Sequence, residues 1–144
     1  MIWYNKKRGD ILITEKIKKI FFNIKNDVNN KMKPYDLTAS QIILLKYLYE
    51  NIDNTVIQKD ICEYLSLKHS TIINILKRLE LKGLIKKNTN YKSEISITKK
   101  GIELVESVGA KKGFVENKLL NGFTKEEIDD LSNYLDRLYS NINN

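Results

Sequence analysis

The chain has 144 residues, of which 42% are hydrophobic and 30% are charged, and its formal net charge is +7. These values are typical of a globular domain and exclude a disordered chain. The single cysteine, Cys62, excludes a disulfide framework and a cysteine-based metal cluster. The sequence contains neither a signal peptide nor an apolar run of the roughly 18 residues that span a bilayer, so we expect a cytoplasmic protein outside the membrane.

Positive charge is concentrated in the middle of the chain. Residues 55–112 hold 12 Lys or Arg against 6 Asp or Glu, and residues 1–54 hold 10 against 6, whereas residues 113–144 hold 3 against 6. A basic centre is expected of a protein that binds a polyanion such as nucleic acid. A basic surface also occurs for solvation alone, so charge by itself leaves both interpretations open.

The first half of the chain predicts helices. Apolar residues recur at helical spacing over residues 10–32, and Pro34 ends this helix because the residue before a proline avoids the helical region. Thr38, followed three residues later by Gln41, is a capping-box pattern that begins a second helix, which ends near Asn51.

A third, short helix is predicted over residues 57–65, and a fourth follows after a tight connection, from His69 to about Leu81. At 100° per residue, one side of the fourth helix is apolar and the opposite side is short, polar and basic. The apolar side holds Ile72, Ile75, Leu76 and Leu79, and the opposite side holds Ser70, Ile73, Asn74 and Lys77. Because such a side suits the edge of a base pair better than open water, we interpret this helix as one that enters a DNA major groove.

A β-hairpin follows the fourth helix. Gly83 is placed to end that helix, and strand-like residues 84–87 and 94–98 bracket a polar tip at 88–93. The order helix, helix, short turn, helix and hairpin is that of a winged helix-turn-helix.

The last part of the chain is again helical. Thr98 is predicted to cap a helix that runs to about Leu120, with Gly109 and Gly113 as sites where it can bend. Thr124 with Glu127 forms a second capping box that opens a final helix. The apolar stripe of this final helix holds Ile128, Leu131, Leu135, Leu138 and Ile142. The long helices at both ends carry more apolar surface than one small domain covers, and a second copy of the chain is the simplest cover.

Several segments in this order resemble the MarR family of bacterial and archaeal transcription regulators. They are Leu37–Gln41, Gln58–Leu65, Lys68–Ile85 and Ile97–Gly101, and the resemblance spans about residues 10–142. It implies an obligate homodimer with interleaved first and last helices, bound to a pseudo-palindromic operator. Many members release DNA when a small aromatic or lipophilic molecule binds. We therefore expect a dimeric, sequence-specific DNA-binding transcriptional regulator that acts as a repressor and responds to such an effector.

The expected fold class is mainly α with a small β-hairpin wing, in a single domain over residues 1–144. Within it, residues 37–101 form the winged helix-turn-helix and residues 99–120 form a linking helix. Residues 1–35 and 113–144 supply the dimerisation helices.

The wing departs from the family pattern. Family members carry an Asp-x-Arg motif there, whose arginine enters the minor groove, whereas Thr89–Lys92 occupies this region and contains no arginine. Either the wing does not insert, or Lys92 inserts instead. The resemblance also implies that Arg78 is structural and pairs with acidic residues near the wing.

The candidate DNA contacts fall into three groups. Ser70, Thr71 and Asn74 are predicted to contact bases or phosphates, since asparagine pairs with adenine in a bidentate way, and Ile73 is placed to pack on a thymine methyl. Alternatively, these side chains form a solvated face or pack on a neighbouring helix. The remaining candidates are predicted to contact phosphate: Lys68, His69, Lys77, Lys86, Lys87 and Lys92.

Base preference follows from the scarcity of arginine. The chain has three arginines against 22 lysines. With few arginines to bind guanine, readout depends on Asn74, Thr71 and Ile73, which favours an A/T-rich operator.

Two other classes of function stay open. One is a winged-helix protein-interaction module without DNA binding, which the atypical wing favours. The other is a membrane-surface protein, because the first helix is basic and amphipathic. An enzyme is not indicated, since the sequence has no phosphate loop, nucleophile elbow or metal-ligand cluster, and His69 stands alone. We expect no catalytic residue, metal site or cofactor.

Overall fold

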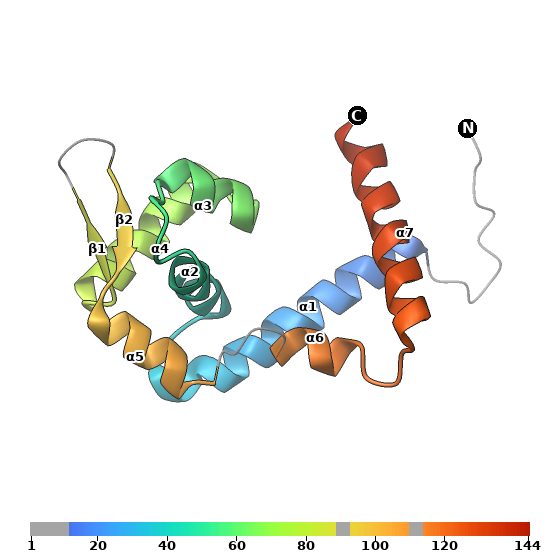
Figure 1. The fold of residues 1–144 in the computed structure, drawn as a ribbon, viewed down its shortest axis with the longest axis horizontal. Coiled ribbons are helices and arrows are strands. Elements are labelled where there is room, and N and C mark those ends of the chain that lie inside the picture. The colour runs from blue at the N-terminus through green and yellow to red at the C-terminus, as the bar shows by residue number, and fades with distance from the viewer. Residues whose placement is uncertain (1–11, 89–92, 110–113) are drawn as a thin grey trace. The chain divides into compact units, whose positions relative to one another are not determined.

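The computed structural model describes residues 12–88, 93–109 and 114–144 (Figure 1). The chain forms two compact units, Met1–Ala110 and Lys111–Asn144. The described residues are mainly helical with one two-stranded antiparallel sheet, which confirms the predicted fold class. Within these residues, no helix is both long enough and apolar enough to span a bilayer.

The first helix, α1 (Ile13–Met32), ends where proline predicts. A short 3-10 turn, η1 (Lys33–Tyr35), contains Pro34, and Asp36 then takes a left-handed conformation with φ of 53°. The C-terminal end of α1 is its buried end, and there the Asn29 side-chain oxygen accepts a hydrogen bond from the backbone N–H of Ala39 at 2.7 Å. This bond fixes where the next helix begins.

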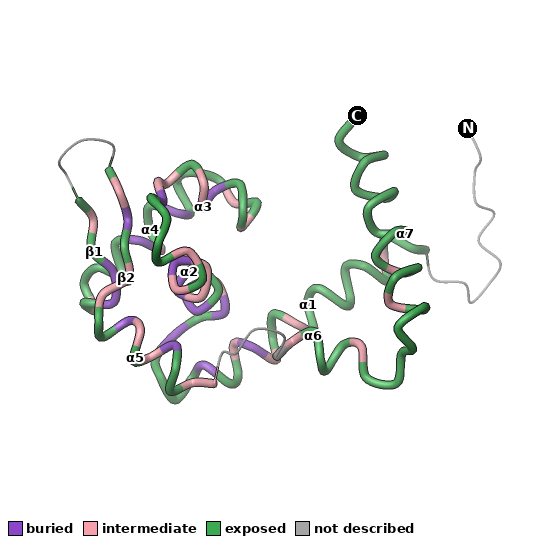
Figure 2. Tube along the Cα trace, viewed as in Figure 1, coloured by how far each residue is buried: buried purple, intermediate pink, exposed green. Residues whose placement is uncertain are grey.

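Helix α2 (Ala39–Glu50) lies in the centre of the first unit. The predicted capping box is confirmed: the Gln41 N–H donates to Thr38 Oγ1 at 3.3 Å, and the Thr38 N–H donates to Gln41 Oε1 at 3.0 Å. Figure 2 shows α2 mostly in the colours of buried and half-buried residues. Its buried apolar residues are Ala39, Ile42, Leu44, Leu45 and Leu48.

Helices α3 (Gln58–Leu65) and α4 (His69–Leu81) form the helix-turn-helix. Ser66, in the turn between them, has a left-handed φ of 52°, which lets the chain reverse within three residues. As predicted, one side of α4 is apolar and buried, and its innermost residues are Ile72, Leu76 and Leu79, with relative exposures of 0, 2 and 0%. Ile75, at the margin of that side, is half-buried.

The wing consists of β1 (Ile85–Lys87) and β2 (Ile95–Ile97), which pair antiparallel with Ile85 opposite Ile97. Gly83 ends α4 as predicted, with a φ of 72°. The Ile95 N–H donates to the carbonyl of Val56 at 2.8 Å, so the wing is tied to the segment before α3. Residues 89–92 at the tip, Lys92 among them, lie outside the described residues.

The helix expected over residues 99–120, with bends at its glycines, is instead interrupted, since α5 ends at Ser107 and α6 begins at Phe114. Helix α5 (Lys99–Ser107) is capped by Thr98 as predicted, because Thr98 Oγ1 accepts from the Gly101 N–H at 3.1 Å. It ends well before Leu120, and Gly109 takes a φ of 62°, a left-handed conformation that commonly ends a helix. A separate short helix, α6 (Phe114–Leu119), opens the second unit.

The second unit is built from α6 and α7 (Lys125–Asn143). The predicted capping box is confirmed, since the Thr124 N–H donates to Glu127 Oε2 at 2.9 Å and the Glu127 N–H donates to Thr124 Oγ1 at 3.2 Å. No residue of α7 is buried within the chain. Its apolar stripe is therefore left open to solvent in a single copy.

The close packing of α5 on the wing predicts that Gly101→Ala destabilises the protein. A Cβ on Gly101 would lie 2.7 Å from Ile97 Cγ1 and closer still to the Leu84 carbonyl oxygen. The better helix propensity of alanine favours the change by up to about 1 kcal/mol, but displacing backbone costs roughly 1–3 kcal/mol. We expect a net loss in the free energy of unfolding, measured by urea denaturation. Lys99→Ala, on the exposed side of α5, is the control, and an unchanged or more stable Gly101→Ala variant contradicts this packing.

Truncating a side chain to alanine should change the stability of the protein by very different amounts on the two sides of α4. Leu76 is itself buried, so Leu76→Ala leaves a cavity in the core and should lower the free energy of unfolding by about 2–5 kcal/mol. Asn74→Ala, on the exposed side two residues earlier, should change it by no more than about 0.5 kcal/mol. Thermal and urea unfolding of both variants measure the difference, and similar losses in the two would contradict the orientation of α4.

Candidate nucleic-acid interface

One side of α4 presents the predicted site residues to solvent together. Ser70, Thr71, Asn74 and Lys77 are exposed, and Ile73 is 36% exposed. Lys68 and His69, at the beginning of the helix, are exposed as well. The structure thus brings these side chains together on the side opposite the buried Ile72, Leu76 and Leu79. It leaves polar and cationic groups around one branched apolar side chain.

The N-terminus of α4 has no side-chain cap, unlike those of α2, α5 and α7. Thr38, Thr98 and Thr124 each cap their helix by accepting a backbone hydrogen bond, whereas Lys68, at the N-cap of α4, makes no side-chain cap. The first N–H groups of a helix have no partner within it, and the helix dipole is positive there. The beginning of α4 therefore offers backbone N–H groups, two hydroxyls and a lysine to an oxyanion.

Helix α3 holds the first residue of α4. The Cys62 sulfur and the Gln58 amide nitrogen lie 3.5 and 3.3 Å from His69 Nδ1, and Cys62 is buried. On the other side of α3, the ring of Tyr64 stacks on that of Tyr47 from α2, with centroids 4.3 Å apart. Burial raises the pKa of the Tyr47 phenol, and the nearby carboxylate of Asp60 raises it further. Sequence periodicity places these residues on α2, α3 and α4 but does not show which of them meet.

The lysines of β1 lie on different sides of the wing. Lys86 is exposed and Lys87 is half-buried, as expected for neighbouring residues of a strand. The exposed side chain of Lys86 can therefore reach a phosphate, whereas only part of the Lys87 side chain is accessible to one. The third predicted wing contact, Lys92, falls outside the described residues.

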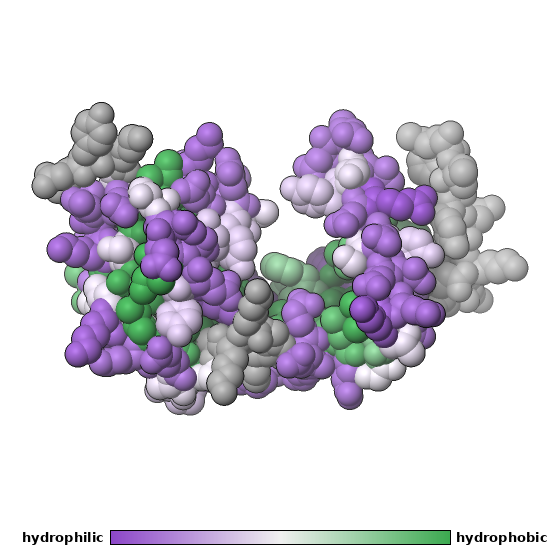
Figure 3. Space-filling view, in the orientation of Figure 1, coloured by the Kyte–Doolittle hydropathy of each residue, from purple (hydrophilic) through white to green (hydrophobic). Residues whose placement is uncertain are grey.

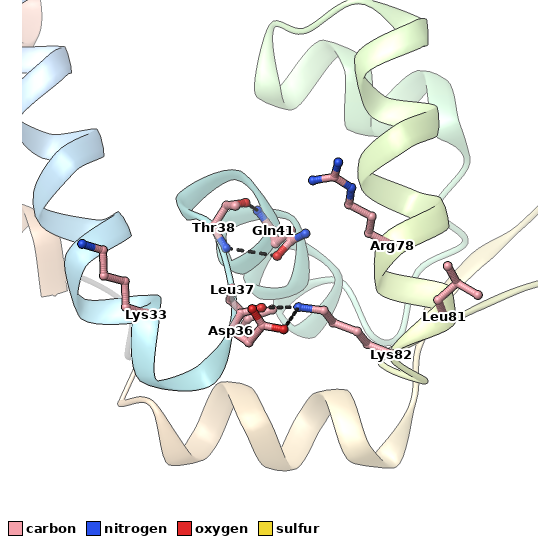
Figure 4. A pocket seen from close by; sticks show the side chains of 8 residues that line it. All are labelled: Lys33, Asp36, Leu37, Thr38, Gln41, Arg78, Leu81 and Lys82. Atoms are coloured by element: carbon pink, nitrogen blue, oxygen red, sulfur yellow. Dashed lines mark hydrogen bonds and ion pairs between the residues drawn. The ribbon is translucent and has the colours of Figure 1, made fainter.

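A pocket of about 480 Å³ lies beside the C-terminal end of α4 (Figure 4). Asp36 and Lys82 point toward one another across it, with 3.2 Å between Nζ and Oδ2, and Lys82 also donates to the backbone carbonyl of Asp36. This contact joins the end of α4 to the turn after α1. The residues that line the pocket are Lys33, Asp36, Leu37, Thr38, Gln41, Arg78, Leu81 and Lys82.

Arg78 does not make the expected contact. The family resemblance implied an ion pair with acidic residues near the wing, but among the residues that the structure describes no carboxylate pairs with Arg78. Its guanidinium instead extends from α4 along the pocket (Figure 4). Three cations, one carboxylate and the apolar Leu37 and Leu81 give the pocket the character of a site for a small organic anion. This pocket was not predicted, because its walls come from two segments that are distant in sequence, residues 33–41 and residues 78–82.

Within residues 12–88, 93–109 and 114–144, no three or more His, Cys, Asp or Glu side chains gather closely enough to hold a metal ion.

Comparison with known proteins gives the same picture. The model of the MarR family matches residues 35–92, which run from the turn before α2 to the tip of the wing. A curated relative is the uncharacterized HTH-type transcriptional regulator YybA of Bacillus subtilis (strain 168). It is 29% identical over 118 residues, a stretch that covers 79% of this chain and 77% of YybA.

Solved structures of similar proteins cover nearly the whole chain. A Staphylococcus aureus MepR–DNA complex aligns with a TM-score of 0.85 and 25% identity, over 94% of this chain and 99% of that one. MepR from the same organism in its DNA-binding conformation aligns with a TM-score of 0.81 and 26% identity, over 92% of this chain and 99% of that one. The transcriptional regulator SlyA aligns with a TM-score of 0.77 and 27% identity, over 90% of this chain and 93% of that one.

The matched family model, the curated relative and these structures coincide with the helix-turn-helix, wing and flanking helices described above. Residues 35–92 match the MarR family, and the chain as a whole has the fold of the winged helix-turn-helix regulators MepR and SlyA.

Proposed function

We propose that this protein is a homodimeric, sequence-specific DNA-binding repressor that reads an A/T-rich, pseudo-palindromic operator with α4. The observation that carries the proposal is the exposed polar and basic side of α4, held outward by a fully buried apolar side. The similarity to a MepR–DNA complex supports it. A protein-interaction module without DNA binding is the alternative, and it would have no need of this particular set of side chains.

Phosphate contacts at the beginning of α4 set the position of the helix. Lys68 leaves the first backbone N–H groups uncapped, and Ser70 and Thr71 add hydroxyls beside them. An anionic oxygen is favoured at such a terminus by both hydrogen bonding and the helix dipole. Lys77, and Lys86 in the wing, extend the cationic surface along the DNA backbone, and Lys87 and Lys92 are assigned the same role.

Base recognition falls to the middle of the exposed side. Asn74 has an amide that pairs with the N6 and N7 atoms of adenine, and Ile73 offers an apolar surface to a thymine methyl. No arginine lies on this part of the helix. The chemistry therefore favours A·T pairs at the positions under α4.

Substitutions at two exposed positions of α4 should separate base reading from phosphate binding. Asn74→Ala should cost about 1–3 kcal/mol on the selected operator and relax the preference at one base pair in each half-site. Lys77→Ala should weaken binding to all sequences and reduce the slope of log affinity against log salt by about 2 per dimer, since each lysine–phosphate contact releases close to one counterion.

Fluorescence anisotropy on duplexes selected from a random pool measures both effects, and the wild-type selection tests the function itself. Each variant is the control for the other, because only one of the two should alter the salt slope. Selection of G/C-rich sites contradicts the base preference, and weak, salt-independent binding by the wild type would favour the protein-interaction module.

The dimer rests on apolar residues that a single copy leaves in water. On α1 these are Ile13, Ile17, Ile20, Phe21 and Phe22, and on α7 they are Tyr134, Leu135, Leu138, Tyr139 and Ile142. Figure 3 shows hydrophobic residues at the visible surface in the region that Figure 1 labels α1. Soluble proteins seldom leave so much apolar surface uncovered, and a second copy of this chain would cover it.

A charge within the apolar stripe of α7 should break the dimer. Leu138→Glu places a carboxylate where the interface would be buried, so we expect monomers in sedimentation velocity and at least a hundredfold weaker binding to a two-half-site operator. Ser140→Glu adds the same charge to the other side of α7 and should leave the dimer intact. If Leu138→Glu remains dimeric, α7 does not form the interface.

We also propose that the pocket beside α4 binds the effector, a small organic anion with an apolar body. Arg78, Lys82 and Lys33 supply charge, and Leu37 and Leu81 supply apolar contact. A carboxylate there would compete with Asp36 for Lys82 and so loosen the contact between the end of α4 and the turn after α1. Weaker DNA binding would follow from this loss of support.

Benzoate serves as a probe of the pocket. We expect it to weaken DNA binding of the wild type in a saturable way, and Arg78→Gln to raise the benzoate concentration for half effect at least about tenfold, since a hydrogen bond to a charged group is lost. Lys59→Gln, which removes one exposed charge from α3, is the control. Equal benzoate responses in the three proteins would place the effector elsewhere.

A further inference from the structure

His69 is the single histidine of the chain, and its ring is held by the preceding helix. Nδ1 lies 3.3 Å from the Nε2 atom of Gln58 and 3.5 Å from the Sγ atom of Cys62, and both partners belong to α3. Cys62 is buried, Gln58 is half-buried and His69 is exposed. One edge of the imidazole therefore faces the protein, and Nε2, on the other edge, is free of these contacts.

The chemistry of the partners fixes the polarity of this contact. An amide nitrogen only donates hydrogen bonds, and a thiol S–H is a weak donor. In a neutral imidazole, one nitrogen carries the proton and the other carries the lone pair. Because the amide nitrogen of Gln58 can only donate, Nδ1 holds the lone pair and Nε2 holds the proton, and the Cys62 thiol is then placed to donate weakly to the same nitrogen.

We propose that Gln58 and Cys62 are positioning residues that hold neutral His69 in the Nε2–H tautomer, so that Nε2–H donates to a phosphate oxygen of bound DNA. The tautomer is a property of the free protein, whereas the phosphate contact rests on the proposed function. Gln58 and Cys62 touch no DNA in this scheme and act through the ring. Their contribution is to set which nitrogen of the neutral ring donates at the N-terminus of α4.

Nitrogen-15 NMR of the free protein tests the tautomer directly, because a single histidine gives a single pair of ring nitrogens. Above the pH range in which imidazole titrates, we expect a protonated Nε2 and an unprotonated Nδ1, with a larger Nε2–H share than the same chain shows in urea. Gln58→Glu replaces the donor by an acceptor and should shift the population toward Nδ1–H. Cys62→Ser retains a donor and should preserve the wild-type spectrum. An Nδ1–H form in the folded wild type, or the same population as in urea, overturns the proposal.

A double-mutant cycle tests the phosphate contact. Gln58→Leu removes the donor without adding charge, and it should weaken DNA binding about two- to tenfold, the range of one ordinary hydrogen bond. In a His69→Ala background the same change should have no effect. Thermal unfolding confirms that each variant folds.

Equal losses in the two backgrounds would mean that Gln58 acts independently of His69, which overturns the positioning role. Absence of DNA binding by the wild type would overturn the proposed function and the phosphate contact together. The NMR measurement needs no DNA, so it decides the tautomer in either case.

Discussion

The packing of the apolar side of α4 on the core is the constraint from which the other features of the interface follow. Ile72, Leu76 and Leu79 are almost completely withdrawn from water. Burying three such side chains is worth several kcal/mol, far more than any single polar contact on the opposite side. The rotation of α4 about its axis is therefore set by the core, and the residues between the buried positions face outward whatever their chemistry. This separation lets the exposed residues vary with the DNA sequence while the fold persists.

Weaker, directional contacts fix the two ends of the same helix. At its beginning, α3 holds His69 through Gln58 and Cys62. At its end, Lys100 donates to the Lys82 carbonyl at 2.8 Å, and Lys82 reaches Asp36 in the turn after α1. The Asp36 side chain is 99% exposed, so its ion pair contributes little to global stability. An effector could therefore displace the Asp36–Lys82 ion pair at a small cost in stability. Displacing the buried apolar side of α4 would cost far more.

Periodicity and capping predict the local structure because both signals are contained within one segment. The buried and exposed sides of α4 follow from spacing alone, and the Thr38–Gln41 and Thr124–Glu127 boxes locate two helix starts to the residue. The break after Ser107 was missed, although Gly109 marked a possible bend, because only the backbone conformation shows that glycine to be left-handed. The Cys62–His69 contact, the Asp36–Lys82 contact and the place of Arg78 depend on how segments distant in sequence meet, and no local pattern encodes them. The family resemblance supplied the wrong partner for Arg78.

Photo-cross-linking at two serines of the first unit tests most directly whether the exposed side of α4 lies on DNA. A photoreactive amino acid is placed at Ser70, on α4, or at Ser107, at the end of α5; both positions are exposed. The account predicts cross-links from Ser70 to bases at two positions about one helical turn apart on a selected operator, and none from Ser107. Equal cross-linking from the two positions, or cross-linking from Ser107 alone, would contradict it.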